Sequence, residues 1–267
     1  LNEIMEDQIY PIHKDKLISN VASQSIRNKH ITSVVMDFLD YDGDEIYFLP
    51  VNGLEGKTVK QAILMLSNVS LIGIRTQTNE VMLNPDKEYI ILDNDLLIVI
   101  AADDDTNLQL NTFPKVNEML NGLKVSVTPF VDKDKLSIFI LGWSKLGQQI
   151  INKTVPFLSK YSEVHFAFKE NLIKTTPIFP GQYNVNIKST LLTHNQNTEI
   201  KQILSEQSFD VILILGYDDV QPQQVSDADS LLLNFHVRSI LNKQKIDKST
   251  RIIMQLNDGS KEELIPK

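Results

Sequence analysis

Three consecutive aspartates, Asp103, Asp104 and Asp105, follow the apolar run of residues 96–102. Carboxylate oxygens are the ligands that Ca²⁺ prefers, but a complete site needs roughly six to eight oxygen ligands. The acids of residues 42–45 would have to supply part of such a site. The alternative is a solvated strand end, at which like charges stop strand pairing. The sequence therefore indicates either a calcium site at Asp103, Asp104 and Asp105 or an ordinary strand terminus.

A glycine-containing turn between an apolar strand and a helix is the second candidate site. A dinucleotide site needs a tight glycine turn at a helix N-terminus and an acid after the next strand for the ribose. Here Gly142 and Gly147 keep only the outer glycines of the GxGxxG pattern, with Trp143 and Ser144 in between, and Glu170 follows the next strand. Two interpretations stay open: a cofactor-binding turn made of these residues, or a degenerate turn retained for packing.

No residue pattern in the chain indicates catalysis. Cysteine is absent, which excludes disulfides, thiolate metal sites and cysteine nucleophiles. The five histidines lack the spacing of a zinc site, and neither GxSxG nor a P-loop is present. We therefore predict that the protein is not an enzyme.

The composition limits the partners and the compartment. The 26 Lys and Arg residues against 34 Asp and Glu give a net charge of −8, which argues against nucleic-acid binding. No apolar stretch approaches the roughly 18–20 residues that span a bilayer, and the N-terminal residues lack the basic-then-apolar order of a signal peptide. As given, the chain is expected to be soluble and cytoplasmic.

Residues 44–103 alternate short strands with one helix. Apolar strand patterns cover residues 45–51, 71–76, 80–84 and 96–101, and helical spacing covers residues 54–66. This pattern predicts a compact α+β unit. The preceding residues 1–43 have a short strand pattern at 8–12 and helical spacing from residue 14 and over 32–39, which we interpret as the end of an earlier lobe.

Residues 134–267 alternate strands and helices. Strand patterns at residues 136–141, 164–168, 183–188, 209–216 and 251–256 are separated by helical segments near 145–157, 198–206 and 227–242. Such alternation predicts a parallel sheet with right-handed crossovers. Pro156 should end or kink its helix, and Ser226 with Asp229 resembles a capping box. Residues 104–133 are interpreted as a linker with one edge strand at 124–128.

Three stretches carry a resemblance to a known family. The first, GLEGKTVKQAILMLSNVSLIGIRTQTNEVMLNPDKEYIILDNDLLIVIAADDDT, resembles the C-terminal lobe of RCK (TrkA-C type) domains. Its acidic ending is similar to that of the CASTOR/POLLUX family of ion channels. FILGWSKLGQQI and FDVILILGYDDVQPQQVSDADSLLLNFHVRSI are similar to two strand and turn segments of the same family. The order and spacing of the three stretches carry the resemblance.

The resemblance implies the fold and the function. It implies an α/β protein in which a Rossmann-like, doubly wound parallel sheet lobe (134–267) accompanies a smaller α+β RCK C-terminal lobe (44–103), with residues 1–43 ending a first Rossmann lobe. The implied function is a cytoplasmic gating module of a potassium or related cation channel. The implied partners are further copies in a dimer or higher ring, and a membrane pore of the same or a partner chain, which attaches the module to the cell membrane.

Two departures from the family pattern weaken any transfer of a ligand site. The usual Gly-Asp turn before the last strand is Asp93-Asn94-Asp95, and Trp143 is followed by Ser-Lys-Leu-Gly. The effector therefore stays open, with calcium and a nucleotide as the candidates. The alternative function is a soluble dinucleotide-binding enzyme or redox sensor, which a Rossmann pattern alone permits.

Overall fold

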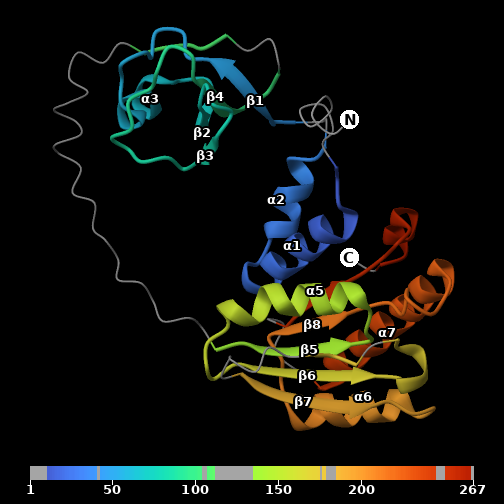
Figure 1. The fold of residues 1–267 in the computed structure, drawn as a ribbon. Helices are drawn as coiled ribbons and strands as arrows, with labels where there is room; N and C mark the ends of the chain where they lie inside the picture. The colour runs from blue at the N-terminus through green and yellow to red at the C-terminus, as the bar shows by residue number, and fades with distance from the viewer. Residues whose placement is uncertain are drawn as a thin grey trace, which may run out of the picture. The chain divides into compact units, whose positions relative to one another are not determined.

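The computed structural model describes residues 11–40, 43–103, 107–111, 135–174, 176–178, 185–244 and 250–265, and the structural statements below concern these residues. The chain divides into two compact units. One contains Leu1–Thr32 and Phe130–Lys267, and the other contains Ser33–Pro129. We call them the parallel unit and the antiparallel unit, after their sheets (Figure 1).

The antiparallel unit has a four-stranded sheet in the order β1-β4-β2-β3. Its strands are β1 (Glu45–Pro50), β2 (Ser70–Arg75), β3 (Val81–Leu83) and β4 (Leu96–Ala101), and its helix is α3 (Val59–Met65). The four strands and the helix lie where the sequence predicts them. One sheet face packs on α3 around a core that contains Leu54, Ala62, Ile74 and Leu97, each fully buried.

A capping box begins α3. The Thr58 hydroxyl accepts a hydrogen bond from the Gln61 backbone N–H, and the Gln61 side chain accepts one from the Thr58 backbone N–H. Two backbone donors that the first helical turn leaves unpaired are thereby satisfied. Gly73 lies in β2 where a Cβ would come within 2.6 Å of the Met82 carbonyl oxygen, so the close approach of β3 requires glycine there.

The parallel unit has a five-stranded sheet in the order β7-β6-β5-β8-β9. All four pairings are parallel, between β5 (Ser137–Leu141), β6 (Glu163–Phe168), β7 (Asn186–Leu191), β8 (Val211–Ile214) and β9 (Arg251–Met254). The chain therefore winds outward from β5 in both directions, as in doubly wound α/β folds. The predicted fold class, a Rossmann-like parallel lobe with a smaller α+β lobe, is confirmed.

Helices cover both faces of the parallel sheet (Figure 1). On one face, α1 (Lys14–Arg27) and α5 (Lys145–Thr154) pack on alternate strand residues such as Ile138, Ile140 and Phe166. On the other face, α6 (Gln196–Glu206) and α7 (Gln223–Gln244) pack on Phe139, Leu141 and their neighbours. Since both faces are covered, the central strands are apolar throughout rather than alternating, as parallel strands usually are.

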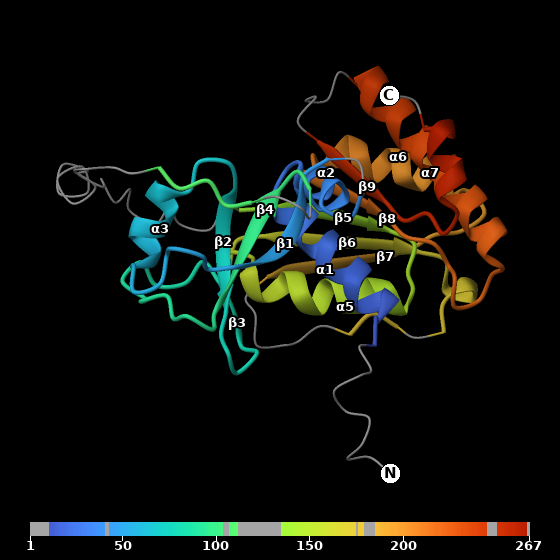
Figure 2. The same ribbon diagram turned by 90° about the horizontal axis from the view of Figure 1, so that it is seen from above.

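Helix α1 belongs to the parallel unit although more than a hundred residues separate it from β5. It lies beside α5 (Figures 1 and 2), and its Ile26 is fully buried in the core of the parallel sheet. The Ser23 hydroxyl accepts a buried hydrogen bond of 3.1 Å from Thr154 of α5. The assignment of residues 1–43 to the end of a first Rossmann lobe stays a prediction, as do the boundaries at 103 and 133. The short helix α2 (Ile31–Asp37) follows α1.

Two predicted element ends differ from the structure. Helix α7 begins at Gln223, directly after Pro222, so Ser226 is a buried residue within the helix and the predicted capping box of Ser226 and Asp229 is wrong. Strand β7 covers residues 186–191 instead of 183–188. Pro156 does end α5, which passes into a 3₁₀ turn, η2 (Val155–Phe157). The predicted strands at 8–12 and 124–128 lie largely or wholly outside the described residues.

Candidate functional site

The carboxyl edge of the parallel sheet contains a hollow of about 350 Å³ beside the point where the strand order reverses, between β5 and β8. Ligands of open α/β sheets bind in the crevice at this switch point. The hollow lies between the turn after β5, the segment after β8, the segment after β9 and the start of α1. Its lining residues are Lys14, Asp15, Ile18, Ser144, Lys145, Leu146, Asp218, Asp219, Gln223, Met254, Gln255, Leu256 and Asn257.

Gly142 and Gly147 are needed for packing around Leu215. Gly142 has φ +82°, and a Cβ there would lie 2.1 Å from the Leu215 carbonyl oxygen. A Cβ on Gly147 would lie 2.7 Å from Leu215 Cδ1 and 3.1 Å from Trp143 Cε3. At Gly142 the obstructing atom belongs to the backbone, so glycine is required there; at Gly147 a Cβ would have to displace the buried side chains of Leu215 and Trp143.

Trp143 points into the core and not into the hollow. It is 1% exposed and packs edge-on against Phe166, with ring centroids 5.2 Å apart. Its indole N–H has no hydrogen-bond partner among the described residues. Trp143 therefore fills the volume beneath the turn with apolar ring atoms, where an open glycine turn would leave space.

The N-terminus of α5 is capped by a distant carboxylate. Ser144, the residue before the helix, has an extended backbone and makes no side-chain capping bond. The backbone N–H of Lys145 instead donates to Asp219 Oδ2 at 2.7 Å. Because a helix N-terminus carries unpaired donors and the positive end of the helix dipole, an anion there is stabilised. In this lobe the anion is a side chain of the protein.

Asp218, the residue before Asp219, forms hydrogen bonds with the segment that follows β9. Asp218 accepts a hydrogen bond of 3.0 Å from the Asn257 side-chain amide and a short one from Gln255 Nε2. Asp218 and Asp219 thus connect the end of β8 to the ends of both neighbouring strands, β9 and β5.

Asp227 in α7 also forms hydrogen bonds with the segment after β9, and its side chain is 1% exposed. Its carboxylate accepts from the backbone N–H groups of Asn257 and Asp258, at 2.9 and 3.1 Å, and from Lys261 Nζ at 3.0 Å. Burial alone would raise the pKa of Asp227, but these hydrogen bonds outweigh it and hold the pKa below its usual value.

The remaining predicted cofactor residue, Glu170, lies apart from the hollow. It begins the 3₁₀ turn η3 (Glu170–Leu172), is exposed and is not among the residues that line the hollow. The structure therefore brings Gly142, Trp143 and Gly147 together in one turn, but it does not bring Glu170 into the same hollow.

The predicted calcium ligands lie only partly within the described residues. Asp103 is exposed and comes two residues after the end of β4, while Asp104 and Asp105 are not described. The residues that the structure describes contain no group of three acidic or histidine side chains placed to hold a metal ion. The calcium site at Asp103, Asp104 and Asp105 stays a prediction.

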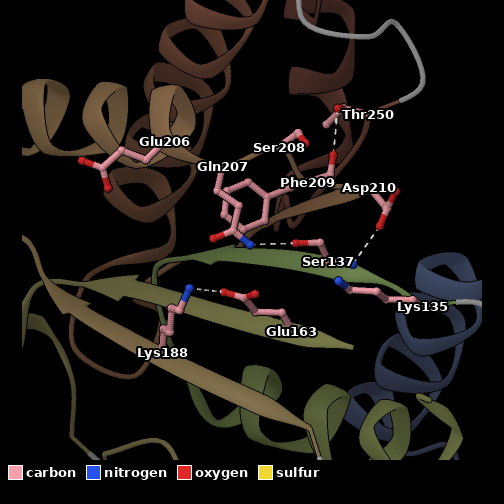
Figure 3. Close-up of a pocket in the computed structure, with 10 residues that line it drawn as sticks. All are labelled: Lys135, Ser137, Glu163, Lys188, Glu206, Gln207, Ser208, Phe209, Asp210 and Thr250. Atoms are coloured by element: carbon pink, nitrogen blue, oxygen red, sulfur yellow. Dashed lines mark hydrogen bonds and ion pairs between the residues drawn. The ribbon is translucent and has the colours of Figure 1, made fainter. Parts of the chain in front are cut away.

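A second hollow, of about 550 Å³, lies at the amino edge of the same sheet (Figure 3). Its lining residues are Lys135, Ser137, Glu163, Lys188, Glu206, Gln207, Ser208, Phe209, Asp210 and Thr250. Many of its polar groups bond one another: Lys188 Nζ lies 2.6 Å from Glu163 Oε1, and Ser137 binds both Gln207 and Asp210. These contacts join neighbouring strand ends.

His165 in β6 contacts Phe209, one of the residues that line this second hollow, and is 8% exposed. Its Nε2 is 2.9 Å from the Thr190 hydroxyl, and Phe139 and Phe209 pack on its ring. Burial lowers the pKa of His165, and the nearby Lys188 lowers it further, against the opposing charge of Glu163. Both effects favour the neutral imidazole, as expected for a structural histidine.

The comparisons with known proteins agree with the family resemblance. Residues 15–117 match the family model described as Castor and Pollux, part of voltage-gated ion channel. The chain is 25% identical over 253 residues to the probable ion channel POLLUX of Oryza sativa subsp. japonica, a match that covers 90% of this chain and 25% of that protein. The chain is therefore similar to proteins named as CASTOR and POLLUX ion channels.

Two further proteins with CASTOR and POLLUX names match the chain to a similar extent. The probable ion channel CASTOR of rice is 25% identical over 249 residues, covering 89% of this chain and 27% of that protein. The ion channel POLLUX of Lotus japonicus is 25% identical over 245 residues, a match that covers 88% of this chain and 26% of that protein. The chain therefore spans about a quarter of the length of these relatives, all of which are named as ion channels.

One solved structure, the crystal structure of the GsuK RCK domain, matches with 16% identity and a TM-score of 0.29, covering 83% of this chain and 39% of that one. A likeness at this TM-score carries no conclusion. Among the described residues, no helix combines the length and the apolar character that crossing a bilayer requires.

The sequence reasoning missed Asp219, Asp218 and Asp227 as the residues that organise the carboxyl edge. A signal for the first two was present: a pair of acids shortly after the apolar strand of residues 211–214, at the edge where α/β folds place their ligand sites. Asp227 had no comparable signal, because its partners lie about thirty residues away in the chain.

Proposed function

We propose that this chain is a regulatory module of a potassium or related cation channel, which transmits the binding of a ligand to a membrane pore in the same protein or in a partner chain. The module would lie on the cytoplasmic side of the membrane and would not be an enzyme. The observation that carries the proposal is the match of residues 15–117 to the Castor and Pollux model. That match includes α1, which is built into the parallel unit, and most of the antiparallel unit.

The chain connectivity suits a module that transmits a conformational change. The chain passes from the parallel unit to the antiparallel unit after residue 32 and returns before residue 135. Two covalent connections therefore join the units. A ligand that binds one arrangement of the units better than another shifts the population toward that arrangement, and covalent connections can carry the difference to a pore.

Association of several copies would suit this function, and α7 offers a surface for it. Its outward side carries Val225, Ala228, Leu232 and Phe235, at the i, i+3, i+7 and i+10 positions of one helix face, and we call this the α7 stripe. Leu232 is 66% exposed and Phe235 is 42% exposed. A stripe of large apolar side chains on a helix surface is a frequent site of subunit contact. We propose that copies of the chain associate through it.

Cation flux through the intact protein tests the proposal. The complete protein that carries this chain is reconstituted in liposomes, and K⁺ and Na⁺ flux are measured with and without Ca²⁺. The expected result is cation flux that depends on an effector. A variant without residues 134–267 should retain a pore but lose the effector response. Liposomes that show no cation flux with the intact protein under any condition would overturn the channel function.

A further inference from the structure

The start of α5 is the place where a Rossmann lobe of this topology would hold the phosphates of a nucleotide. In such lobes the phosphates lie against the N-terminus of the helix that follows the first strand, where free backbone N–H groups and the helix dipole attract an anion. Here the first strand is β5 and the helix is α5, which begins at Lys145. The Lys145 N–H is already bonded to Asp219 Oδ2 at 2.7 Å.

The carboxylate of Asp219 is held in this position by its neighbour. Asp218, the preceding residue, is bonded to Gln255 and Asn257 after β9. Asn257 in turn donates to the buried Asp227. The segment that carries Asp219 is therefore fixed to the parallel unit on the side away from α5, and Asp219 is not a freely moving surface side chain.

The turn after β5 has no space for a phosphate group close to its backbone. Glycines admit a pyrophosphate because they lack a Cβ, but the space beside Gly142 is taken by the Leu215 carbonyl, and that beside Gly147 by Leu215 and Trp143. Glu170, the predicted ribose acid, is exposed and does not line the hollow. The residues present do not fit a bound dinucleotide.

We propose that the switch point of this lobe is closed by an internal anion: the Asp219 carboxylate takes the position of a nucleotide phosphate at the N-terminus of α5, and the lobe binds no nucleotide there. The glycines of the GWSKLG turn are retained for packing against Leu215 and Trp143. In place of a ligand, Asp219 joins the end of β8 to the start of α5, while Asp218 joins it to the segment after β9.

The charge at the edge makes the closure effective against phosphates. A nucleotide phosphate that approached Lys145 would have to displace one carboxylate while lying near a second, Asp218, and near Asp15 of α1, which lines the same hollow. The lining also includes two cationic side chains, Lys14 and Lys145, but the three carboxylates outnumber them, and like charges disfavour an incoming anion. If the chain regulates a pore as proposed above, its effector must bind at another place.

The test follows the Lys145 amide directly. The complete chain is labelled with ¹⁵N-lysine, and the Lys145 amide resonance is assigned from a Lys145→Arg variant. Inorganic phosphate, ATP and NADH are then added in turn at millimolar concentration. The expected result is an unchanged Lys145 resonance with each anion, including the case in which one of them binds elsewhere on the chain. A saturable shift of this resonance in the parent chain would overturn the proposal.

An Asp219→Ala variant tests the contact itself. Removal of the carboxylate should move the Lys145 resonance without any added anion, and loss of a capping interaction should lower the melting temperature by about 2–4 °C. The matched control is Asp15→Asn, which removes a negative charge from the same hollow but no capping bond, and should leave the Lys145 resonance in place. A Lys145 resonance that is the same in Asp219→Ala as in the parent would show that Asp219 is not its partner.

Discussion

The Arg251 Nη2 atom lies 2.8 Å from the carbonyl oxygen of Ile26, and Nη1 of the same side chain lies 2.9 Å from the carbonyl oxygen of Ser25. Arg251 begins β9, while the two carbonyls belong to the last turn of α1, whose C-terminal carbonyl groups have no partner within the helix. A cation at this end of a helix also interacts favourably with the helix dipole. One arginine therefore fixes α1 to the parallel sheet.

Arg251→Met should destabilise the parallel unit by about 2 kcal/mol, because a charged donor to two carbonyls is lost. Trp143, the only tryptophan of the chain, is buried in this unit, so its fluorescence follows urea unfolding of the parallel unit alone. Arg251→Lys should recover only part of the loss, since an ammonium group cannot reproduce the two-pronged geometry. Lys201→Met, an exposed charge on α6, is the control. An Arg251→Met chain as stable as that control would show that the hydrogen bonds from Arg251 to Ser25 and Ile26 do not stabilise the parallel unit.

Asp227 should make the parallel unit sensitive to acid. Its pKa is lowered in the folded state, so its stabilising effect is present above the unfolded value of about 3.9 and is lost as the pH falls through the folded pKa. Asp227→Asn should cost about 2 kcal/mol at pH 7, and the difference from the parent should shrink at pH 3. Urea unfolding at both pH values measures this. A difference that does not change between them would mean that the charge of Asp227 is not involved.

His165 should produce a separate pH dependence at higher pH. Its folded pKa is lowered by burial, so the unfolded chain binds a proton first, and stability should fall as the pH drops from about 6.5 toward the folded pKa. His165→Gln cannot titrate but keeps a side chain able to bond the Thr190 hydroxyl. The parent should lose more stability than this variant between pH 7.5 and 5.5, as measured by thermal melting. Parallel losses in the two proteins would assign the effect to other groups.

The α7 stripe should control self-association. Leu232→Asp together with Phe235→Asp places two charges in the proposed contact, where their burial would be strongly unfavourable. Light scattering at tens of micromolar should report a multiple of the chain mass for the parent and the single-chain mass for the double variant. Lys201→Glu, an exposed charge change on α6 and outside the stripe, should leave the mass unchanged. A parent chain that is monomeric at this concentration would remove the proposed interface.

Calcium binding at Asp103, Asp104 and Asp105 should be visible as stabilisation. A ligand that binds only the folded chain raises the free energy of unfolding by RT ln(1 + [L]/Kd), which is about 2.7 kcal/mol at 100 times Kd. Millimolar Ca²⁺ should therefore raise the melting temperature of the chain, and Mg²⁺ should do less because it surrenders its water reluctantly. With all three aspartates changed to Asn the shift should vanish. If the triple variant responds as the parent does, the ion binds elsewhere.

Local patterns predicted most elements of both units. The strands of the antiparallel unit were placed correctly because their apolar residues form short runs bounded by turn residues such as Asn84 and Pro85. The predicted range of strand β7 lies three residues too early because the strand is at a sheet edge, where only Ile187 and Thr190 are partly buried and the apolar pattern is weak. Helix α7 begins at Gln223 and not at the predicted Asp227, because proline favours a helix start and Pro222 directly precedes the helix, whereas Ser226 and Asp229 only have the spacing of a capping box.

The candidate site was less predictable than the fold. The sequence located the turn of residues 142–147 correctly, but the decisive contact joins Lys145 to Asp219, which are separated by 74 positions. Spacing within a motif gives no information on such a partner, because it depends on which strands become neighbours. The same reason explains why the connection of α1 to α5 and Arg251 could not be derived from the helical pattern of residues 14–27.

The position of α1 also determines the order in which the chain can fold during synthesis. The antiparallel unit is contiguous, so every residue of its sheet has left the ribosome once residue 101 is outside. The parallel unit is interrupted, and the surface on which Ile26 is buried does not exist until β5, α5 and β8 have been made. The side of α1 that packs on the parallel sheet therefore stays uncovered by that sheet until more than a hundred further residues have been synthesised. Nascent chains halted before β5 are expected to be the ones most exposed to chaperones and proteases.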